Sequence, residues 1–118
     1  MVSSFKELRI WQEGVALAKE VYVLADQLPE NERYGLRSQI TRAAVSVPSN
    51  IAEGSRRRGT NDLHHFLSIA LGSLAELETQ LIIATEIGLF KDTQCSPVFE
   101  RIEAIARGIV KLQQTLKP

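Results

Sequence analysis

The stretch that decides the fold class is residues 63–84, which read LHHFLSIALGSLAELETQLIIA. Its apolar residues recur at steps of three and four, the spacing of one face of an α-helix. This seam consists of Leu63, Leu67, Ala70, Leu74, Leu77, Leu81 and Ala84. We therefore expect a helix that begins at Thr60 or Asn61 and ends at Gly88. The small residues Ala70, Gly72 and Ser73 should let a neighbouring helix approach closely.

The segment before this seam predicts a second helix, with a buried stripe made of Leu36, Ile40, Ala43, Ala44, Val47 and Ile51. Pro48 removes one backbone hydrogen bond, so we expect the helix to continue with a kink. Gly54 is a favourable exit residue, and we expect residues 54–59, which contain three arginines, to form an exposed loop.

The first helix carries two apolar series and should end near Leu28, because Pro29 follows. We assign the first series to the bundle core: Leu8, Trp11, Val15, Ala18, Tyr22 and Ala25. The second series lies beside it, and we expect part of the widened face to contact another subunit: Leu17, Val21, Leu24 and Leu28.

The last segment predicts a helix that starts with Ser96 as its cap and Pro97 in its first turn. Its expected buried residues are Phe99, Ile102, Ile105, Ile109, Leu112 and Leu116. No alternation typical of β-strands competes with these patterns. Four helices with short connections predict an all-α fold, an antiparallel up-down-up-down four-helix bundle that forms a single domain over residues 1–118.

Composition narrows the functional class. The 118 residues include one cysteine, Cys95, which cannot form an intramolecular disulfide, and no signal-peptide pattern is present, so we expect a cytoplasmic protein. The apolar runs are too short to predict a membrane span. Aromatic residues make up 6% of the chain, with the single tryptophan Trp11, which argues against a base-stacking platform.

Basic side chains are concentrated in one internal segment. Residues 33–58 hold six basic and one acidic side chain, whereas residues 59–90 hold four acidic and none that is basic. The six arginines are Arg33, Arg37, Arg42, Arg56, Arg57 and Arg58. Because guanidinium groups suit phosphate oxygens, this cluster is a candidate site for nucleic-acid backbone. The alternative is a solvated surface whose arginines pair with carboxylates of the same chain.

A polar row also follows the second helix at steps of three and four: Gln39, Arg42, Ser46, Asn50 and Glu53. This row could present hydrogen-bonding groups to a partner. Alternatively, Asn50 and Glu53 could satisfy each other and the groups freed by Pro48.

Catalytic patterns are sparse. His64 and His65 are adjacent and diverge by about 100° on a helix, so we expect no metal site and no cofactor. The spacing from Arg58 to His64 resembles the Arg-x(4 to 6)-His signature of HEPN-type ribonucleases, which would make His64 an acid or base and Arg58 a phosphate ligand. Cys95 has no histidine nearby in the sequence, and residues 54–59 lack the lysine and hydroxyl of a P-loop. We therefore predict a protein that is not an enzyme.

Several motifs together resemble the bacterial four-helix-bundle family of proteins encoded in intervening sequences of 23S ribosomal RNA genes. The motifs are Phe5-x-x-Leu8-x-x-Trp11-Gln12, the segment from Pro29 to Gln39, the segment from Arg42 to Gly54 and the segment from Phe66 to Leu77. The most specific one contains Ser46, Pro48, Asn50, Glu53 and Gly54. The resemblance implies a mobile-element-derived protein that forms a homopentamer.

Two main hypotheses follow. In the first, a cytoplasmic homo-oligomer binds RNA or DNA backbone through Arg56, Arg57 and Arg58, with help from Arg33, Arg37 and Arg42. In the second, the chain is a protein–protein interaction scaffold without a nucleic-acid role. The HEPN-like ribonuclease is a third alternative. No membrane partner and no small-molecule substrate are indicated by the sequence.

Overall fold

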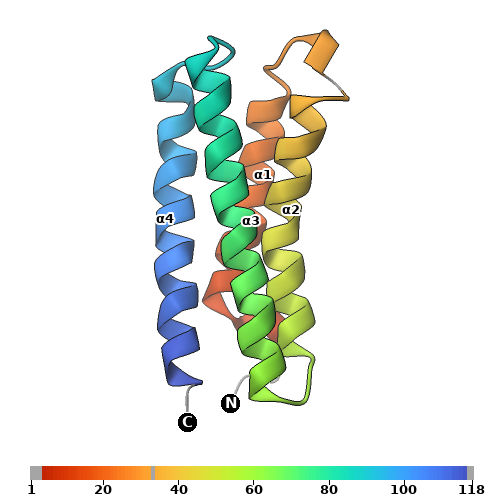
Figure 1. Cartoon of the computed structure of the whole chain (residues 1–118), viewed down its shortest axis with the longest axis vertical. Coiled ribbons are helices and arrows are strands. Elements are labelled where there is room, and N and C mark those ends of the chain that lie inside the picture. Colours follow the sequence, from red (N-terminus) through yellow and green to blue (C-terminus); the bar gives the residue numbers. More distant parts are fainter. Residues whose placement is uncertain (1–3, 33, 117–118) are drawn as a thin grey trace.

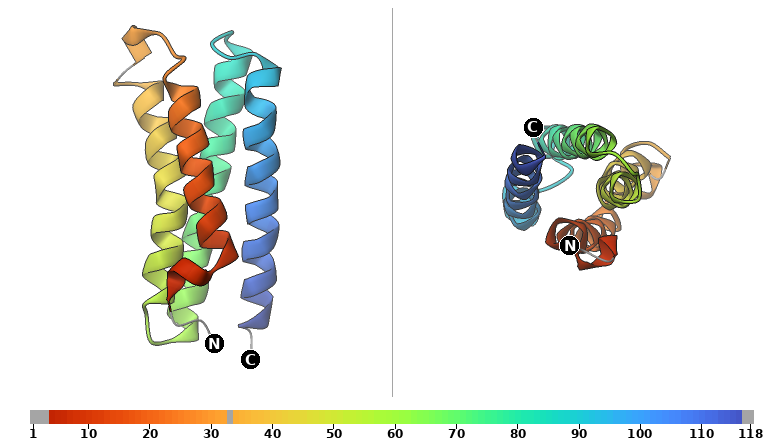
Figure 2. Two further views of the ribbon diagram at one scale, coloured as in Figure 1. Left: turned by 180° about the vertical axis from the view of Figure 1, so that it is seen from behind. Right: turned by 90° about the horizontal axis from the view of Figure 1, so that it is seen from below.

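The computed structural model describes residues 4–32 and 34–116 of the chain. Four α-helices form a rod of 46 × 21 × 20 Å: α1 (Arg9–Ala25), α2 (Leu36–Ser55), α3 (Thr60–Glu86) and α4 (Asp92–Thr115) (Figure 1). The short 3₁₀ helices η1 (Phe5–Glu7) and η2 (Glu30–Glu32) precede α1 and α2. The helices alternate in direction, and Figure 2 shows them arranged around one core, so the predicted all-α up-down bundle is confirmed.

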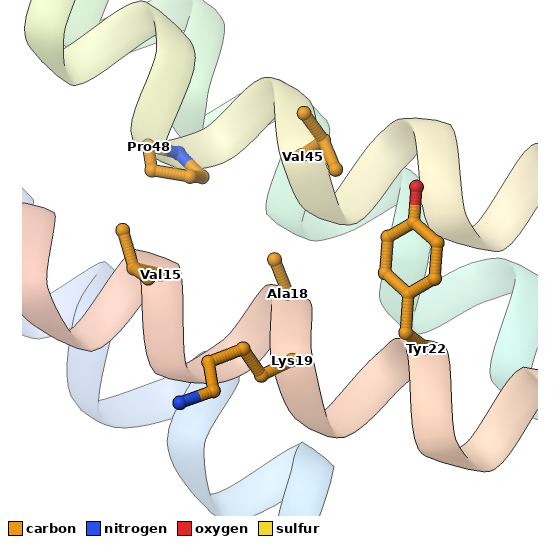
Figure 3. Close-up of a pocket in the computed structure, with 6 residues that line it drawn as sticks. All are labelled: Val15, Ala18, Lys19, Tyr22, Val45 and Pro48. Atoms are coloured by element: carbon orange, nitrogen blue, oxygen red, sulfur yellow. The ribbon is translucent and has the colours of Figure 1, made fainter.

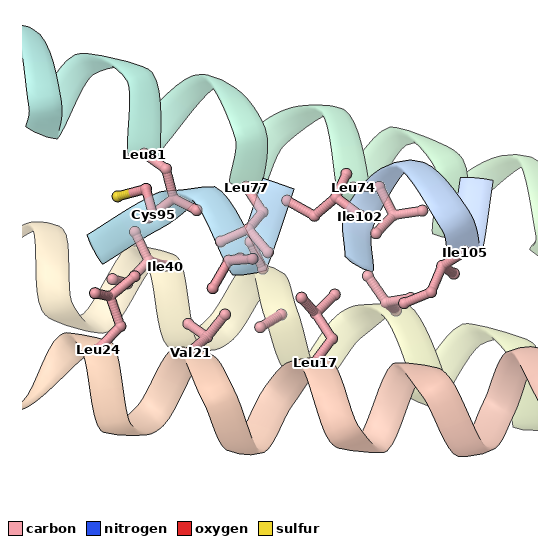
Figure 4. Close-up of a cluster of buried hydrophobic side chains, with 14 of the residues drawn as sticks. Leu17, Val21, Leu24, Ile40, Leu74, Leu77, Leu81, Cys95, Ile102 and Ile105 are labelled. Atoms are coloured by element: carbon pink, nitrogen blue, oxygen red, sulfur yellow. The ribbon is translucent and has the colours of Figure 1, made fainter. Parts of the chain in front are cut away.

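Most of the predicted apolar stripes meet in this core (Figure 4). The seam of α3 and the stripe of α2 are buried as expected, apart from the half-buried Leu36 and Leu63. In α4, Ile102, Ile105 and Ile109 are buried, whereas Phe99, Leu112 and Leu116 are only partly buried. Each of the four predicted segments therefore forms a helix with one buried face.

The assignment of the two apolar series of α1 was wrong for the second series and correct only in part for the first. The series of Leu17, Val21, Leu24 and Leu28 is at most 5% exposed and forms the core, so it cannot contact another subunit. In the first series, Ala25 is buried and Leu8, Trp11 and Ala18 pack against the core, whereas Tyr22 is 54% exposed. Because α1 packs against both α2 and α4, the centre of its buried face falls on the second series.

The start of α4 also differs from the prediction. The helix begins at Asp92, four residues before Ser96, and the backbone N–H of Lys91 donates to Gln94 Oε1 at 2.7 Å. Ser96 Oγ donates to the Asp92 carbonyl at 2.9 Å, so this hydroxyl lies inside the helix rather than capping it. Pro97 is tolerated in the helix, at the cost of one backbone hydrogen bond.

The ends of α2 and α3 have different causes. Gly88 has φ +86°, and the N–H groups of Gly88 and Leu89 donate to the carbonyls of Thr85 and Ala84, which closes α3 as predicted. Gly54 instead lies inside α2, and a Cβ there would come within 2.7 Å of Phe66 Cβ. Gly54 is therefore a close-packing residue of the α2–α3 contact, and its prediction as a helix exit was wrong.

Helix α3 is the one helix in the described part of the chain that is long and apolar enough to cross a membrane by length and composition. Its leucine seam is buried in the core, but only 33% of the apolar stretch is buried, because Ile69, Ile82 and Ile83 are exposed.

We expect Gly54→Ala to lower the free energy of unfolding by about 1–2 kcal/mol, because the added methyl group would overpack the contact with Phe66. Gly72→Ala is the matched control, since a Cβ at Gly72 meets nothing within 4 Å. The control should raise stability by about 0.5–1 kcal/mol through helix propensity. Urea unfolding of both variants measures the difference, and equal effects would contradict the close-packing role.

Leu17→Ala should cost about 2–5 kcal/mol, because a fully buried leucine leaves a cavity when it is truncated. Truncation of the exposed Tyr22 to alanine in the same helix should change the stability of the folded chain by much less. Thermal or urea unfolding at a protein concentration low enough to disfavour association makes the comparison. A larger loss for Tyr22→Ala would mean that the stripes are assigned the wrong way round.

Candidate functional site

The arginines predicted to form one basic surface lie along the whole length of α2. The helix has 20 residues and is therefore about 30 Å long, with Arg37 in its first turn and Arg56, Arg57 and Arg58 beyond its last. Arg42 lies between them, and Arg33 lies outside the described residues. The structure therefore does not bring the predicted cluster together at a single end of the bundle.

Arg37 is used inside the protein. Its Nη2 donates to the Leu28 carbonyl at 3.0 Å, which ties the connection between α1 and α2 to the start of α2. Its Nε is buried without a hydrogen-bond partner among the described residues. Because the side chain is half-buried and bonded to backbone, Arg37 has a structural role at the start of α2.

The α2–α3 turn holds the remaining cluster, and we call Arg56, Arg57 and Arg58 the arginine turn. All three residues are exposed. Arg57 is paired within the chain: its Nη2 and Nε lie 2.9 and 3.0 Å from Glu53 Oε2, and its guanidinium carbon is 4.9 Å from the centre of the Phe66 ring. For Arg56 and Arg58, no ion pair is found within residues 4–32 and 34–116. The turn therefore presents two unpaired cations.

The polar row of α2 separates into structural contacts. Ser46 Oγ lies 2.8 Å from Ser73 Oγ of α3, and Asn50 Nδ2 donates to the carbonyl and the hydroxyl oxygen of Ser46 at 2.8 and 2.9 Å. Glu53 pairs with Arg57 and not with Asn50. Gln39 and Arg42 remain at the surface, beside a shallow groove of about 270 Å³ that also contacts Glu76. Ser46 and Asn50 thus join α2 to α3.

The resembling motif has a structural explanation at each of its positions. Besides these bonds of Ser46 and Asn50, Pro48 packs so closely against α1 that a Cβ at Gly14 would lie 3.2 Å from Pro48 Cβ. Glu53 holds Arg57, and Gly54 leaves room for Phe66. Sequence reasoning missed Gly14, although a glycine within a helical stripe is a signal of close approach.

The histidines lie near the start of α3, at the end of the bundle that carries the arginine turn (Figure 1). The half-buried His64 accepts a hydrogen bond at its carbonyl from Gln113 Nε2 at 3.1 Å, and the exposed His65 packs edge-on against Phe66. Within the described residues, no group of three or more histidine, cysteine, aspartate or glutamate side chains could hold a metal ion. Burial raises the pKa of Cys95, which keeps this thiol protonated and unreactive.

One further charged contact was not predicted from the sequence. Arg101 of α4 bridges two carboxylates of α1, with Nε 2.6 Å from Glu20 and Nη1 2.5 Å from Glu13. The hydrogen bond that Arg101 donates to Glu20 contributes most to the raised pKa of Arg101. The signal in the sequence is the spacing of seven between Glu13 and Glu20, which puts both on one helix face.

An apolar groove lies between α1 and α2 on the side of the rod, and we call it the α1–α2 groove (Figure 3). Its volume is about 340 Å³, and its lining residues are Val15, Ala18, Lys19, Tyr22, Val45 and Pro48. Three of these belong to the series of α1 that was predicted to be core. The exposed fraction is 54% for Tyr22 and 39% for Val45, so this apolar surface faces solvent in the single chain.

Comparison with known proteins identifies the family. The family model of the 23S rRNA-intervening sequence protein matches residues 6–111. The chain belongs to this family. It is also similar in fold to a structure of a protein of unknown function from the S23 ribosomal protein family of Bacteroides thetaiotaomicron, with a TM-score of 0.82 and 20% identity over 88% of this chain and 97% of that chain. A search of curated proteins finds no match.

The matched range includes all the motifs that carried the resemblance, apart from Phe5. The motif residues of α2 within this range are the ones whose contacts hold α1 and α3 in place. At 20% identity, the similarity to the solved structure concerns the fold alone.

Proposed function

We propose that this chain is a non-catalytic cytoplasmic protein whose copies assemble head to tail through the α1–α2 groove. The observation that supports the proposal is the solvent-exposed apolar lining of this groove, with Tyr22 and Val45 at its edges. An exposed apolar surface framed by polar residues is typical of an interface. The family resemblance favours the same kind of protein, because it implies a homopentamer.

A second copy of the chain offers a matching surface on α3. Ile69, Glu76 and Ile83 are spaced by seven residues and so share one face, which Ile87 extends by another turn. All four residues are exposed. We call these residues the outer face of α3. It differs from the groove, so the contact would be heterologous, the type of interface that closes rings.

Charge favours the same pairing. Residues 59–90, which include α3, hold four acidic side chains and no basic one, whereas residues 33–58, which include α2, hold six basic side chains and one acidic. Lys19 at the groove would therefore face Glu76 of the outer face of α3 in the next copy, whereas Arg42 already lies beside Glu76 of its own chain. Such complementarity steers two copies toward this orientation.

The test uses one substitution on each surface, chosen to repel the opposing charge. Tyr22→Glu in the groove and Ile83→Lys on the outer face of α3 should each convert the oligomer to a monomer in sedimentation or light-scattering measurements. Val110→Lys is the matched control, because Val110 is a similarly exposed apolar residue on α4, outside both surfaces.

Mixing the two disrupted variants should yield a one-to-one heterodimer, because each retains the surface that the other has lost. This result would separate head-to-tail assembly from a symmetric contact. A wild-type chain that stays monomeric at micromolar concentration, or two variants that remain assembled, would overturn the proposal.

A second candidate function is binding of nucleic-acid backbone, and the observation that favours it is the pair of unpaired cations in the arginine turn. In a closed ring, each copy adds Arg56 and Arg58, which raises the local positive potential. The contribution of Arg37 and Arg42 is reduced, since Arg37 is bonded to Leu28 and Arg42 lies along the side of the rod, whereas Arg33 lies outside the described residues. Contacts to backbone alone imply little sequence preference.

Replacing Arg56 and Arg58 with alanine should weaken binding of a labelled single-stranded RNA. The dependence of log K on log salt concentration should become shallower by about 0.7 for each phosphate of the single strand that the variant no longer neutralises. Arg107→Ala is the control, because Arg107 is an exposed arginine that pairs with Glu103 at 2.8 Å on α4. Absence of binding to RNA and DNA at about 50 mM salt would exclude this candidate.

A further inference from the structure

A cleft lies at the end of the bundle that carries the arginine turn, with which it shares Arg56. It is separate from the α1–α2 groove and from the outer face of α3. Its walls come from the N-terminal segment, the end of α2, the start of α3 and the end of α4, and its volume is about 600 Å³. The lining residues are Ser4, Phe5, Lys6, Leu8, Ser55, Arg56, Leu63 and Leu112. This volume lies within the range of sites for small molecules, about 300–1,000 Å³. We call it the end cleft.

Part of the end cleft is apolar. Leu8, Leu63 and Leu112 are only partly buried, although each packs against the core. The Phe5 ring is fixed by an edge-on contact with Trp11, with 5.3 Å between ring centres. These side chains offer a surface of the size that a flat ring system can cover, and they remain open because no described side chain fills the space between the N-terminal segment and α4.

The rest of the lining is polar and cationic. Lys6 and Arg56 come from different elements and are both exposed, and no carboxylate lines the end cleft. The nearby Glu7 carboxylate accepts a hydrogen bond from the Ser4 backbone N–H at 3.1 Å, and Glu53 is engaged with Arg57. Two cations around an uncompensated opening favour an anionic ligand.

The hydroxyl groups provide further selectivity. Ser4 Oγ accepts from the Lys6 backbone N–H at 3.2 Å and can still donate, whereas Ser55 Oγ donates to the Ile51 carbonyl at 2.7 Å and can still accept. Four of the eight lining residues are thus polar, whereas only Lys19 is charged in the α1–α2 groove. An alkyl chain would form no hydrogen bond with these groups, whereas the polar edge of a nucleobase can do so.

We propose that the end cleft binds a nucleoside monophosphate unit, with the base over Leu63 and Leu112 and the phosphate between Lys6 and Arg56. The unit is either a free nucleotide or the phosphorylated end of a strand, since both present the same chemistry. The inference rests on the second candidate function, to which it adds a defined site, and it does not require assembly of the chain.

The single Trp11 provides a direct readout, because its ring contacts Phe5 at the wall of the end cleft. Titration with millimolar adenosine or uridine monophosphate should shift the one indole N–H resonance in a ¹H–¹⁵N spectrum in a saturable way. Adenosine and uridine, which lack the phosphate, should bind about tenfold or more weakly, because they lose charge-assisted hydrogen bonds. Inorganic phosphate should compete.

Lys6→Ala and Arg56→Ala should each weaken nucleotide binding by about tenfold or more. Arg58→Ala is the matched control, since Arg58 belongs to the same turn and is equally exposed but does not line the end cleft. Equal losses in all three variants would indicate diffuse electrostatic attraction and overturn the site. Saturable binding of an alkyl phosphate without binding of either nucleotide would overturn the ligand class.

Oligonucleotides with and without a terminal phosphate distinguish a strand end from a free nucleotide as the ligand of the end cleft. If an oligonucleotide with a terminal phosphate binds more tightly than the same strand without it, and this difference disappears in Lys6→Ala, the end cleft takes a strand end. If only the free nucleotide depends on Lys6, it takes a free nucleotide. Strand binding that depends on Arg58 but not on Lys6, together with no response of Trp11 to nucleotides, would support the second candidate function and refute this inference.

Discussion

The close approach of α2 to both of its neighbours is the constraint on which the rest of the bundle depends. On one side, Gly14 of α1 leaves just enough room for Pro48, and on the other, Gly54 leaves room for Phe66 of α3. On the same helix, Ser46 and Asn50 form a hydrogen-bonded link with Ser73 across the α2–α3 contact. Small residues and satisfied polar groups fix how the helices cross, and the leucine seam of α3 then packs into the space that remains.

Helical spacing was sufficient to predict the number of helices, their order and most of the core, because a seam such as that of α3 has only one way to be buried. In α1 the same reasoning was correct only in part, because it placed Tyr22 in the core and the second series at a subunit contact. Both of its apolar series obey helical spacing, and the choice between them depends on α4, which contacts α1 through Arg101 with Glu13 and Glu20. A pattern within one helix contains no information about a second neighbour.

The basic cluster illustrates a different limit. Six arginines within 26 residues are close in sequence, but a helix separates residues by about 1.5 Å each, so Arg37 and the arginine turn lie at opposite ends of α2. Glu53 then compensates the charge of Arg57, and the hydrogen bond to the Leu28 carbonyl holds the Arg37 side chain against the fold without compensating its charge. Conversely, the end cleft combines residues near both ends of the chain with residues around the α2–α3 turn, so no local motif could have indicated it.

The positions of the exposed surfaces decide whether assembly and ligand binding are compatible. The α1–α2 groove and the outer face of α3 lie along the sides of a rod that is more than twice as long as it is wide, whereas the arginine turn and the end cleft lie at one tip. Contacts through the sides leave the tip open. In a cyclic ring, every copy is related to the next by the same rotation, so rods aligned with the ring axis present all their arginine tips on one side. The positive potential of these tips then adds up, although the chain as a whole has no net charge.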